Sequence, residues 1–163
     1  MSRKITIGVM GAGSGATPVN IQDAETLGRA IADQGWVTLT GGRPAGVMEA
    51  ANRGAKAANG LTVGILPGSD RHQASEFVDI VICTDLGNAR NNVNTLSADV
   101  VVAVGMGMGT ASEVALAIKN SRPVILLKPD AETQNFFRKF APHQIEIAPT
   151  VDAAIALIKK HLT

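Results

Sequence analysis

Cysteine, aromatic side chains and charge are all scarce in this chain of 163 residues. It has one cysteine, one tryptophan, four phenylalanines and no tyrosine. A single cysteine excludes both an internal disulfide framework and a cysteine metal cluster. So few aromatic rings do not provide the stacking platforms that nucleic-acid bases need. The net charge is +1 and no Lys/Arg run occurs, so binding to a nucleic-acid phosphate backbone is not expected.

Long apolar runs are absent as well. No stretch reaches membrane-spanning length, and the N-terminus leads into a short apolar run without the pattern of a signal peptide. We therefore expect a cytoplasmic protein that partners neither a membrane nor a nucleic acid. The length fits one domain over residues 1–163, and 17 glycines with abundant alanine and valine are typical of tight α/β packing.

Apolar, β-branched runs alternate with helix-like segments along the chain. The runs are continuous, which is typical of strands covered on both faces, and the helical segments supply right-handed crossovers. The sequence predicts an α/β fold: a three-layer, doubly wound, mostly parallel, Rossmann-like sheet with helices on both faces. Strands are expected at 5–10, 36–40, 61–66, 80–83, 100–104, 124–127 and 145–147, and helices at 21–34, 47–58, 89–97, 111–120, 133–140 and 151–161.

Two of the expected strands run into glycine-rich turns, at residues 11–15 and 105–110, and the second turn opens directly onto a helix. Glycine permits a sharp turn with exposed N–H groups, and a helix N-terminus adds partial positive charge. Ligands of parallel sheets bind beyond the carboxyl ends of the strands, so both turns are candidates for holding a phosphate. The candidate residues are Gly11, Gly13 and Ser14 in the first turn and Gly107, Met108, Gly109 and Thr110 in the second.

The first turn departs from the dinucleotide fingerprint. That fingerprint needs a helix at once and an acid at the end of the second strand to bind a ribose. Here Thr17-Pro18 delays the helix, and the second strand ends at Thr40-Gly41-Gly42-Arg43 without an acid. NAD binding is therefore disfavoured, and a tight turn with no ligand stays open as the alternative.

Arginine follows two further strands. Gly41 and Gly42 let the backbone approach a ligand, and Arg43 is a candidate partner for an anion. An ordinary turn with a solvated arginine explains the same residues. Arg90 lies in a segment with four asparagines, of which helix capping explains one but not all. We expect Arg90 to bind a phosphate and the amides, including Asn91 and Asn92, to bind the edge of a heterocycle.

The remaining reactive residue types form no recognisable catalytic or metal-binding pattern. Glu113 follows the second glycine turn and is a candidate site residue, although a helix-dipole carboxylate is the alternative. His72 follows the third strand in a polar loop, where a solvated side chain is the simpler interpretation. Cys83 ends an apolar run, so we expect a buried, unreactive thiol. No metal site is expected.

A set of motifs resembles one superfamily from Lys4 to about Leu127. The set is Thr40-Gly41-Gly42, Gly46-Val47-Met48, Arg90-Asn91, Ser97-Ala98-Asp99 and Gly107-Met108-Gly109-Thr110 with Glu113. It resembles the Lonely Guy family, also called lysine-decarboxylase-like, and its SLOG-type relatives. The resemblance implies a Rossmann-like fold, a nucleotide-like phosphate site and homo-oligomers, either dimers or tetramers.

Two branches of that superfamily predict different functions. The Lonely Guy enzymes release the base from nucleoside 5′-monophosphates, and their signature is Pro-Gly-Gly-x-Gly-Thr followed by paired acids. Here Val104-Gly105-Met106 replaces Pro-Gly-Gly and Ser112-Glu113 replaces the acids. If the chain is an enzyme, Glu113 and Arg90 are the catalytic candidates; otherwise no catalytic residue is expected.

The other branch, the molybdenum cofactor carrier proteins, is more similar in its glycine turns and in the Asn-rich segment around Arg90. Its cargo is molybdenum cofactor (Moco, molybdopterin), a pterin with one terminal phosphate and an anionic molybdenum–dithiolene end. The resemblance implies that residues 107–110 hold the phosphate, that Asn91, Asn92 and Asn94 bind the pterin edge, and that Arg43 or Arg90 offsets the metal end.

We therefore expect a carrier that binds, protects and delivers the cofactor without transforming it. Molybdoenzymes or a cofactor insertase would be its transient partners. The alternatives are a nucleoside monophosphate phosphoribohydrolase and a nucleotide-sensing domain, which would normally need a fused effector.

Overall fold

Strands and helices alternate along the chain in the computed structural model, which describes residues 3–163. The strands are β1 (Thr6–Gly11), β2 (Val37–Thr40), β3 (Leu61–Leu66), β4 (Ile80–Cys83), β5 (Val100–Val104), β6 (Val124–Leu127) and β7 (Ile145–Ala148). The α-helices are α1 (Pro18–Asp33), α2 (Gly46–Ala57), α3 (Arg90–Ser97), α4 (Met108–Lys119), α5 (Ala131–Phe140) and α6 (Val151–Leu162), with short 3-10 helices η1 (Arg71–Gln73) and η2 (Gly87–Ala89).

The strands form one sheet in the order β4-β3-β2-β1-β5-β6-β7, and the neighbouring pairs are all parallel. The chain builds outward from β1 to β4, then crosses back and builds outward in the other direction from β5. The strand order therefore reverses between β1 and β5, where Gly11 pairs with Val104. This is an α/β Rossmann-like fold, as the sequence predicts.

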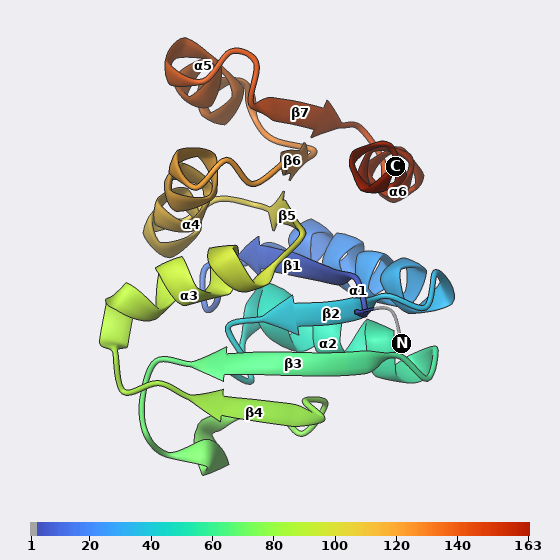
Figure 1. Cartoon of the computed structure of the whole chain (residues 1–163), viewed down its shortest axis with the longest axis vertical. Helices are drawn as coiled ribbons and strands as arrows, with labels where there is room; N and C mark the ends of the chain where they lie inside the picture. The colour runs from blue at the N-terminus through green and yellow to red at the C-terminus, as the bar shows by residue number, and fades with distance from the viewer. Residues whose placement is uncertain (1–2) are drawn as a thin grey trace.

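Helices cover both faces of the sheet (Figure 1): α1, α2 and α6 lie on one face and α3, α4 and α5 on the other. The sequence of strand β5 is uniformly apolar because both faces of this strand are buried. Val100, Val102 and Val104 face the core beneath α1, α2 and α6, whereas Val101 and Ala103 face the core beneath α4 and α5. A central strand of a three-layer fold thus buries both of its faces.

Two helices begin three residues earlier than the sequence predicts. Thr17 caps α1 and Pro18 occupies its first turn, so this proline opens the helix rather than delaying it. Helix α4 begins at Met108, which places Gly109 and Thr110 within its first turn. Glycine is a poor helix former, and this concealed the start of α4 in the sequence.

Strand β4 lies at the edge of the sheet, and the Cys83 thiol at its end is exposed. The expectation of a buried thiol is therefore wrong. An apolar run does not indicate whether its strand is central or at an edge, and β4 lacks a neighbour on one side. Within residues 3–163, no helix has the length and apolarity needed to cross a membrane.

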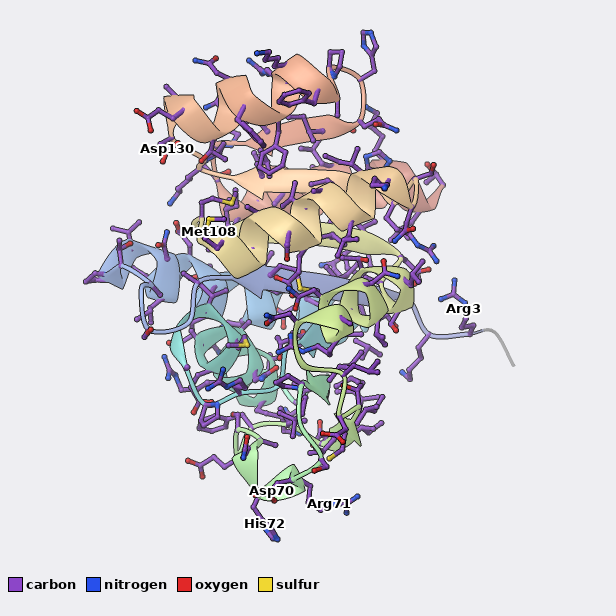
Figure 2. The ribbon with its side chains drawn as sticks, turned by 90° about the vertical axis from the view of Figure 1, so that its left-hand side faces the viewer. Arg3, Asp70, Arg71, His72, Met108 and Asp130 are labelled. Carbon is purple, nitrogen blue, oxygen red and sulfur yellow. The ribbon has the colours of Figure 1, made fainter. Side chains whose placement is uncertain are left out.

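The two ends of the sheet lie far apart. In Figure 2, Asp70, Arg71 and His72 project at one end of the molecule, well away from Met108 at the start of α4. His72 therefore lies away from the second glycine turn and does not line the cleft described next.

Candidate functional site

A cleft of about 460 Å³ lies where the strand order reverses, above the carboxyl ends of β1 and β5. Parallel α/β sheets bind their ligands at this position because the loops that follow the two strands diverge toward opposite faces. The lining residues come from the turns after β1, β2 and β5 and from the starts of α3 and α4: Gly11, Ala12, Gly13, Ser14, Gly15, Arg43, Ala45, Met48, Asn88, Arg90, Asn91, Met106, Gly107, Met108, Gly109, Thr110 and Glu113.

The turn after β1 is locked to the start of α2. The Val47 N–H donates to the Ala12 carbonyl over 3.0 Å. Gly46 has a φ of +52°, and a Cβ there would collide with the carbonyl oxygens of Ala12 and Gly13. Glycine is thus required at this start of a helix, and one wall of the cleft is held in place by backbone alone.

The helices α2 and α4 begin at the cleft without a side-chain cap, although the Val47 N–H of α2 is already bonded to Ala12. Gly107 precedes α4 and Ala45 precedes α2, and neither residue makes a side-chain capping hydrogen bond. By contrast, α1, α5 and α6 are capped by Thr17, Asp130 and Thr150. The first N–H groups of a helix have no partner within the helix, and the helix dipole makes that end positive. The cleft therefore offers backbone donors suited to an anion, and those of α4 coincide with the predicted phosphate turn.

Arg90 is the buried cation of the site. Its side chain opens α3, is 8% exposed, and lies with Nη1 3.8 Å from Oε1 of Glu113. Its Nε is buried without a hydrogen-bond partner. A buried donor left unpaired is costly, so this nitrogen has bonding capacity for a ligand. Burial lowers the pKa of the Arg90 guanidinium below its usual range, as does the charge of Arg43, while Glu113 opposes the shift.

Gly41 makes room for that guanidinium. A Cβ at Gly41 would come within 2.7 Å of Arg90 Nη1 and 2.8 Å of the Met48 sulfur. The sequence predicts that Gly41 lets the backbone approach a ligand. In the structure Gly41 instead lies behind Arg90 and does not line the cleft. It shapes the site indirectly because it fixes where the guanidinium lies.

Glu113 faces Arg90 from the first turns of α4 and is 6% exposed. Burial raises the pKa of its carboxyl above the ordinary value, although the hydrogen bond from Asn94 Nδ2 at 2.9 Å and the charge of Arg90 act in the opposite direction. Asn94 is itself buried, and its Oδ1 has no partner. Arg90, Asn94 and Glu113 therefore form a polar cluster that is incompletely paired within the chain.

Arg43 lies exposed at the rim of the cleft, in the turn after β2. Two arginines and the positive helix ends outweigh the single carboxylate of Glu113. The cleft is thus positive as a whole, and its charge favours a ligand with more than one negative group.

The structure brings most of the predicted site residues together at this cleft. Gly41, Gly42, Asn92 and the fully buried Asn94 are the exceptions. Gly42 packs against the Gly64 backbone of β3, and Asn92 accepts a 2.7 Å hydrogen bond from Asn120 Nδ2 between α3 and α4. The residues that line the cleft as predicted are Gly11, Gly13, Ser14, Arg43, Arg90, Asn91, Gly107, Met108, Gly109, Thr110 and Glu113. Their role in binding stays a prediction.

Sequence reasoning left out several lining residues, among them Ala12, Ala45 and Met48. Ala12 lies between two predicted residues, Gly11 and Gly13, but an alanine gives no chemical signal in a sequence. Asn91 donates to Ser112 Oγ at 2.8 Å, so one of its amide hydrogens is already engaged. Within residues 3–163, no cluster of His, Cys, Asp and Glu is arranged to hold a metal ion.

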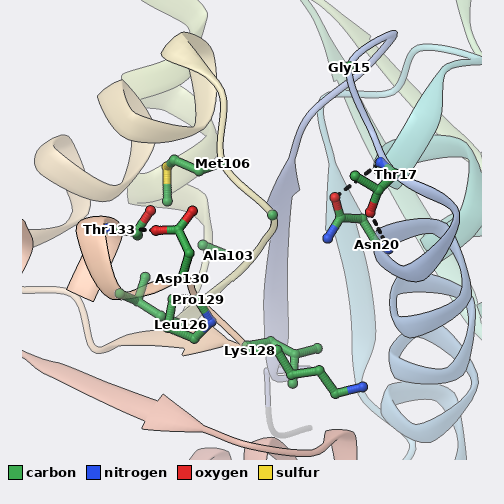
Figure 3. A pocket seen from close by; sticks show the side chains of 12 residues that line it. Gly15, Thr17, Asn20, Ala103, Met106, Leu126, Lys128, Pro129, Asp130 and Thr133 are labelled. Atoms are coloured by element: carbon green, nitrogen blue, oxygen red, sulfur yellow. Dashed lines mark hydrogen bonds between the residues drawn. The ribbon is translucent and has the colours of Figure 1, made fainter.

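A second pocket of about 270 Å³ adjoins the cleft, above the carboxyl ends of β5 and β6. Figure 3 shows Met106, Asp130 and Thr133 on one side of it and Thr17 and Asn20 on the other. The two cavities share Gly15 and Met106 as lining residues. They are therefore neighbours on the same edge of the sheet, separated by the turn that follows β5.

Comparison with known proteins identifies relatives of this sequence and fold. The sequence matches the SLOG cluster4 family over residues 4–155. A molybdenum cofactor binding protein from Rippkaea orientalis superimposes with a TM-score of 0.98 at 55% identity, covering 100% of both chains. The molybdenum cofactor carrier protein of Chlamydomonas reinhardtii gives 0.93 at 48% identity, covering 98% of this chain and 99% of that one. A cytokinin riboside 5′-monophosphate phosphoribohydrolase from Mycobacterium tuberculosis is 28% identical over 76% of this chain and 71% of its own.

The coupling between Arg90 and Glu113 can be measured directly. Replacing Arg90 by methionine removes a positive charge that lowers the Glu113 pKa, so this pKa should rise further. Carbon-13 NMR titration of the labelled Glu113 carboxyl measures the shift. Arg43→Met is the matched control and should leave the Glu113 pKa unchanged, because Arg43 acts on Arg90 rather than on this carboxyl. An unchanged Glu113 pKa in Arg90→Met would contradict the coupling.

Proposed function

Because this chain belongs to the SLOG cluster4 family, with a fold and sequence close to those of molybdenum cofactor binding and carrier proteins, we propose that it binds and carries molybdenum cofactor. The observation that carries the proposal is the cleft between β1 and β5. It joins the uncapped start of α4 to a buried arginine whose Nε has no partner. A pterin that bears a phosphate at one end and an anionic metal–dithiolene group at the other requires positive groups at both ends.

The residues present fit that cargo by type. The first N–H groups of α4, at residues 108–110, suit the terminal phosphate. Arg90 and Arg43 carry the positive charge for the anionic dithiolene end. Asn91 lines the cleft beside Arg90 and keeps one amide N–H for the pterin edge, whereas Asn94 is buried behind the cleft and positions Glu113. The cofactor is cargo, and its dithiolene sulfurs supply ligands to the metal, so protein metal ligands are not required.

The acid–base groups of the cleft support a carrier rather than a hydrolase. Glycosidic cleavage commonly uses two carboxylates, one of them as an acid or base. Among the described residues that line the cleft, Glu113 alone bears a carboxylate. Ser112 donates to the Gly109 carbonyl at 2.7 Å and accepts from Asn91, so its hydroxyl serves to fix α4 and α3. Delivery to a molybdoenzyme or a cofactor insertase in the cytoplasm completes the proposed function.

Retention of the cofactor tests the proposal. After anaerobic mixing with isolated cofactor and gel filtration, the protein should retain molybdenum and pterin in near-stoichiometric amounts per subunit. Thr110→Val and Arg90→Gln should each weaken binding about tenfold, the effect expected for a lost charge-assisted hydrogen bond. Arg29→Gln, on the exposed side of α1, is the control and should retain the cofactor. Retention no better than that of an unrelated protein would reject the carrier function.

Base release from nucleotides tests the alternative. Incubation with AMP should release adenine no faster in the wild type than in Glu113→Gln, as measured by chromatography. Ser112→Glu restores a second carboxylate beside Glu113 and should not improve cofactor retention. Base release by the wild type that Glu113→Gln abolishes would instead establish phosphoribohydrolase activity.

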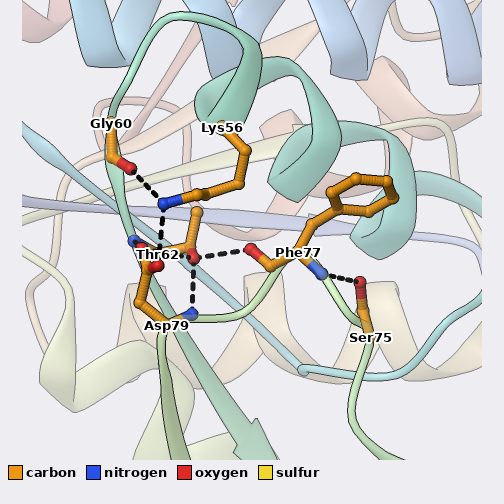
Figure 4. Close-up of polar contacts among 6 residues, drawn as sticks. All are labelled: Lys56, Gly60, Thr62, Ser75, Phe77 and Asp79. Carbon is orange, nitrogen blue, oxygen red and sulfur yellow. Dashed lines mark hydrogen bonds and ion pairs between the residues drawn. The ribbon is translucent and has the colours of Figure 1, made fainter.

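We further propose that the chain forms a homo-oligomer through its β4 edge. Three apolar side chains are exposed at this edge: Ile80 at 46%, Ile82 at 42% and Leu86 at 51%. An exposed apolar strand edge is a typical contact surface for a second chain. An ion pair and hydrogen bonds fix the start of this edge strand (Figure 4). Lys56 Nζ lies 2.7 Å from Asp79, and Asp79 accepts hydrogen bonds from both the backbone N–H and the hydroxyl of Thr62. A second copy would therefore dock on an ordered strand.

Light scattering coupled to gel filtration measures the oligomer. The mass should be two or four times the 16.9 kDa of one chain. Ile82→Lys should lower that mass because it places a charge on the proposed contact. Val19→Lys changes an apolar residue at the start of α1 that is even more exposed, at 57%, and should leave the mass unchanged. If Ile82→Lys has no effect, β4 is not the contact.

A further inference from the structure

The second pocket, above β5 and β6, takes no part in the placement of the cofactor proposed above. Its volume of about 270 Å³ falls just below the range of roughly 300–1,000 Å³ typical of independent small-molecule sites. It opens beside the turn after β5, which also leads into the phosphate-binding start of α4. A cavity of this size and place suits an extension of the ligand that occupies the main cleft.

The turn between the two cavities is narrow and built by backbone. Gly105 has a φ of +69°, and a Cβ there would come within 2.6 Å of Asn20 Oδ1. Gly15, which lines both cavities, has nothing within 4 Å of where its Cβ would lie. A chain of atoms leaving a phosphate at the start of α4 therefore meets Met106 and Gly15 before it enters the second pocket.

The charges of the second pocket favour a neutral group. Lys128 is its cation, but the Lys128 ammonium is already paired with Asp23 at 2.7 Å. Asp130 adds a carboxylate, which repels a second anion. A pocket that binds free phosphate would instead present an unpaired cation or uncapped helix end, whereas Asp130 caps α5 here. The pocket thus discriminates against a phosphate and in favour of an uncharged fragment.

The lining has the character of a base site. Ala103, Leu126 and Leu127 form its nearly buried floor, Pro129 supplies accessible apolar surface, and Met106 supplies a thioether that packs well against an aromatic face. Asp130 accepts the Thr133 N–H at 2.7 Å, and a carboxylate has about four acceptor positions in all. It can therefore also accept N–H groups from the edge of a base. Guanine presents two such groups side by side.

The backbone conformation of Lys128 shapes the wall of the pocket formed by Pro129 and Asp130. Lys128 adopts a left-handed φ of +46°, which is uncommon for a residue with a side chain. Its N–H donates to Ala148 at 2.9 Å and its ammonium pairs with Asp23, so both ends hold the conformation. The turn directs Pro129 and Asp130 toward the pocket (Figure 3).

We propose that the second pocket receives the nucleoside of a dinucleotide form of the cargo, in which a guanosine monophosphate is joined to the pterin phosphate through a pyrophosphate. This inference rests on the proposed carrier function and names the form of cofactor that the chain accepts. The pterin and metal end lies in the main cleft, the pyrophosphate at the start of α4, and the base against Met106 and Asp130.

Two variants test the pocket without touching the main cleft. Thr133→Leu fills the second pocket, and Asp130→Asn removes the carboxylate while asparagine keeps the ability to cap α5. Asp152→Asn, in the first turn of α6, is the matched control. Each protein is titrated anaerobically with the isolated monophosphate cofactor and, separately, with the guanine dinucleotide form, and retained molybdenum and pterin are measured after gel filtration.

The wild type should bind the dinucleotide at least as tightly as the monophosphate form. Asp130→Asn and Thr133→Leu should weaken dinucleotide binding about tenfold and change monophosphate binding by no more than about twofold. If the wild type retains the monophosphate form and excludes the dinucleotide, or if the variants affect both forms equally, the second pocket is not a nucleoside site. Retention of neither form would reject the carrier function itself.

Discussion

The reversal of strand order between β1 and β5 is the constraint on which the site depends. In a sheet whose strands are all parallel, every carboxyl end lies at one edge, and the loops after β1 and β5 must leave it toward opposite faces. The cleft between these two loops must then be lined by backbone, which can approach a neighbouring segment closely only where no side chain intervenes. This explains why Gly46 meets the turn after β1 and why the helices α2 and α4 begin at the cleft without capping side chains.

A buried cation, Arg90, makes this backbone-lined cleft prefer an anionic ligand. Arg90 is held by Gly41 behind it and Glu113 beside it, but at 3.8 Å the pair is longer than a hydrogen bond. Burying charges without full pairing costs stability. Such a cost persists where a ligand supplies the missing partner, and at the cleft the unpaired atom is the Nε of Arg90.

The sequence predicts the fold and most of the cleft because both follow from short-range patterns. Continuous apolar runs mark buried parallel strands, and the turns after β1, β2 and β5 reach one edge whatever the details of packing. It does not predict what depends on neighbours distant in the chain. Cys83 is exposed because β4 lies at an edge, and Asn92 lies beside Asn120 because α3 packs on α4. Likewise, Gly41 leaves room for the guanidinium of Arg90, which is 49 residues further along the chain.

A carrier and a phosphoribohydrolase can share this framework because both must first hold a phosphate beside a heterocycle. The difference lies in what surrounds Glu113. Burial raises the pKa of this carboxyl, and Asn94 and Arg90 hold it in a fixed position. With Ser112 at the preceding position, no second carboxylate lies next to Glu113 in the chain. A lone buried carboxylate beside an arginine can accept a hydrogen bond from a pterin. It lacks the partner that bond cleavage commonly requires. This arrangement supports the proposed carrier function.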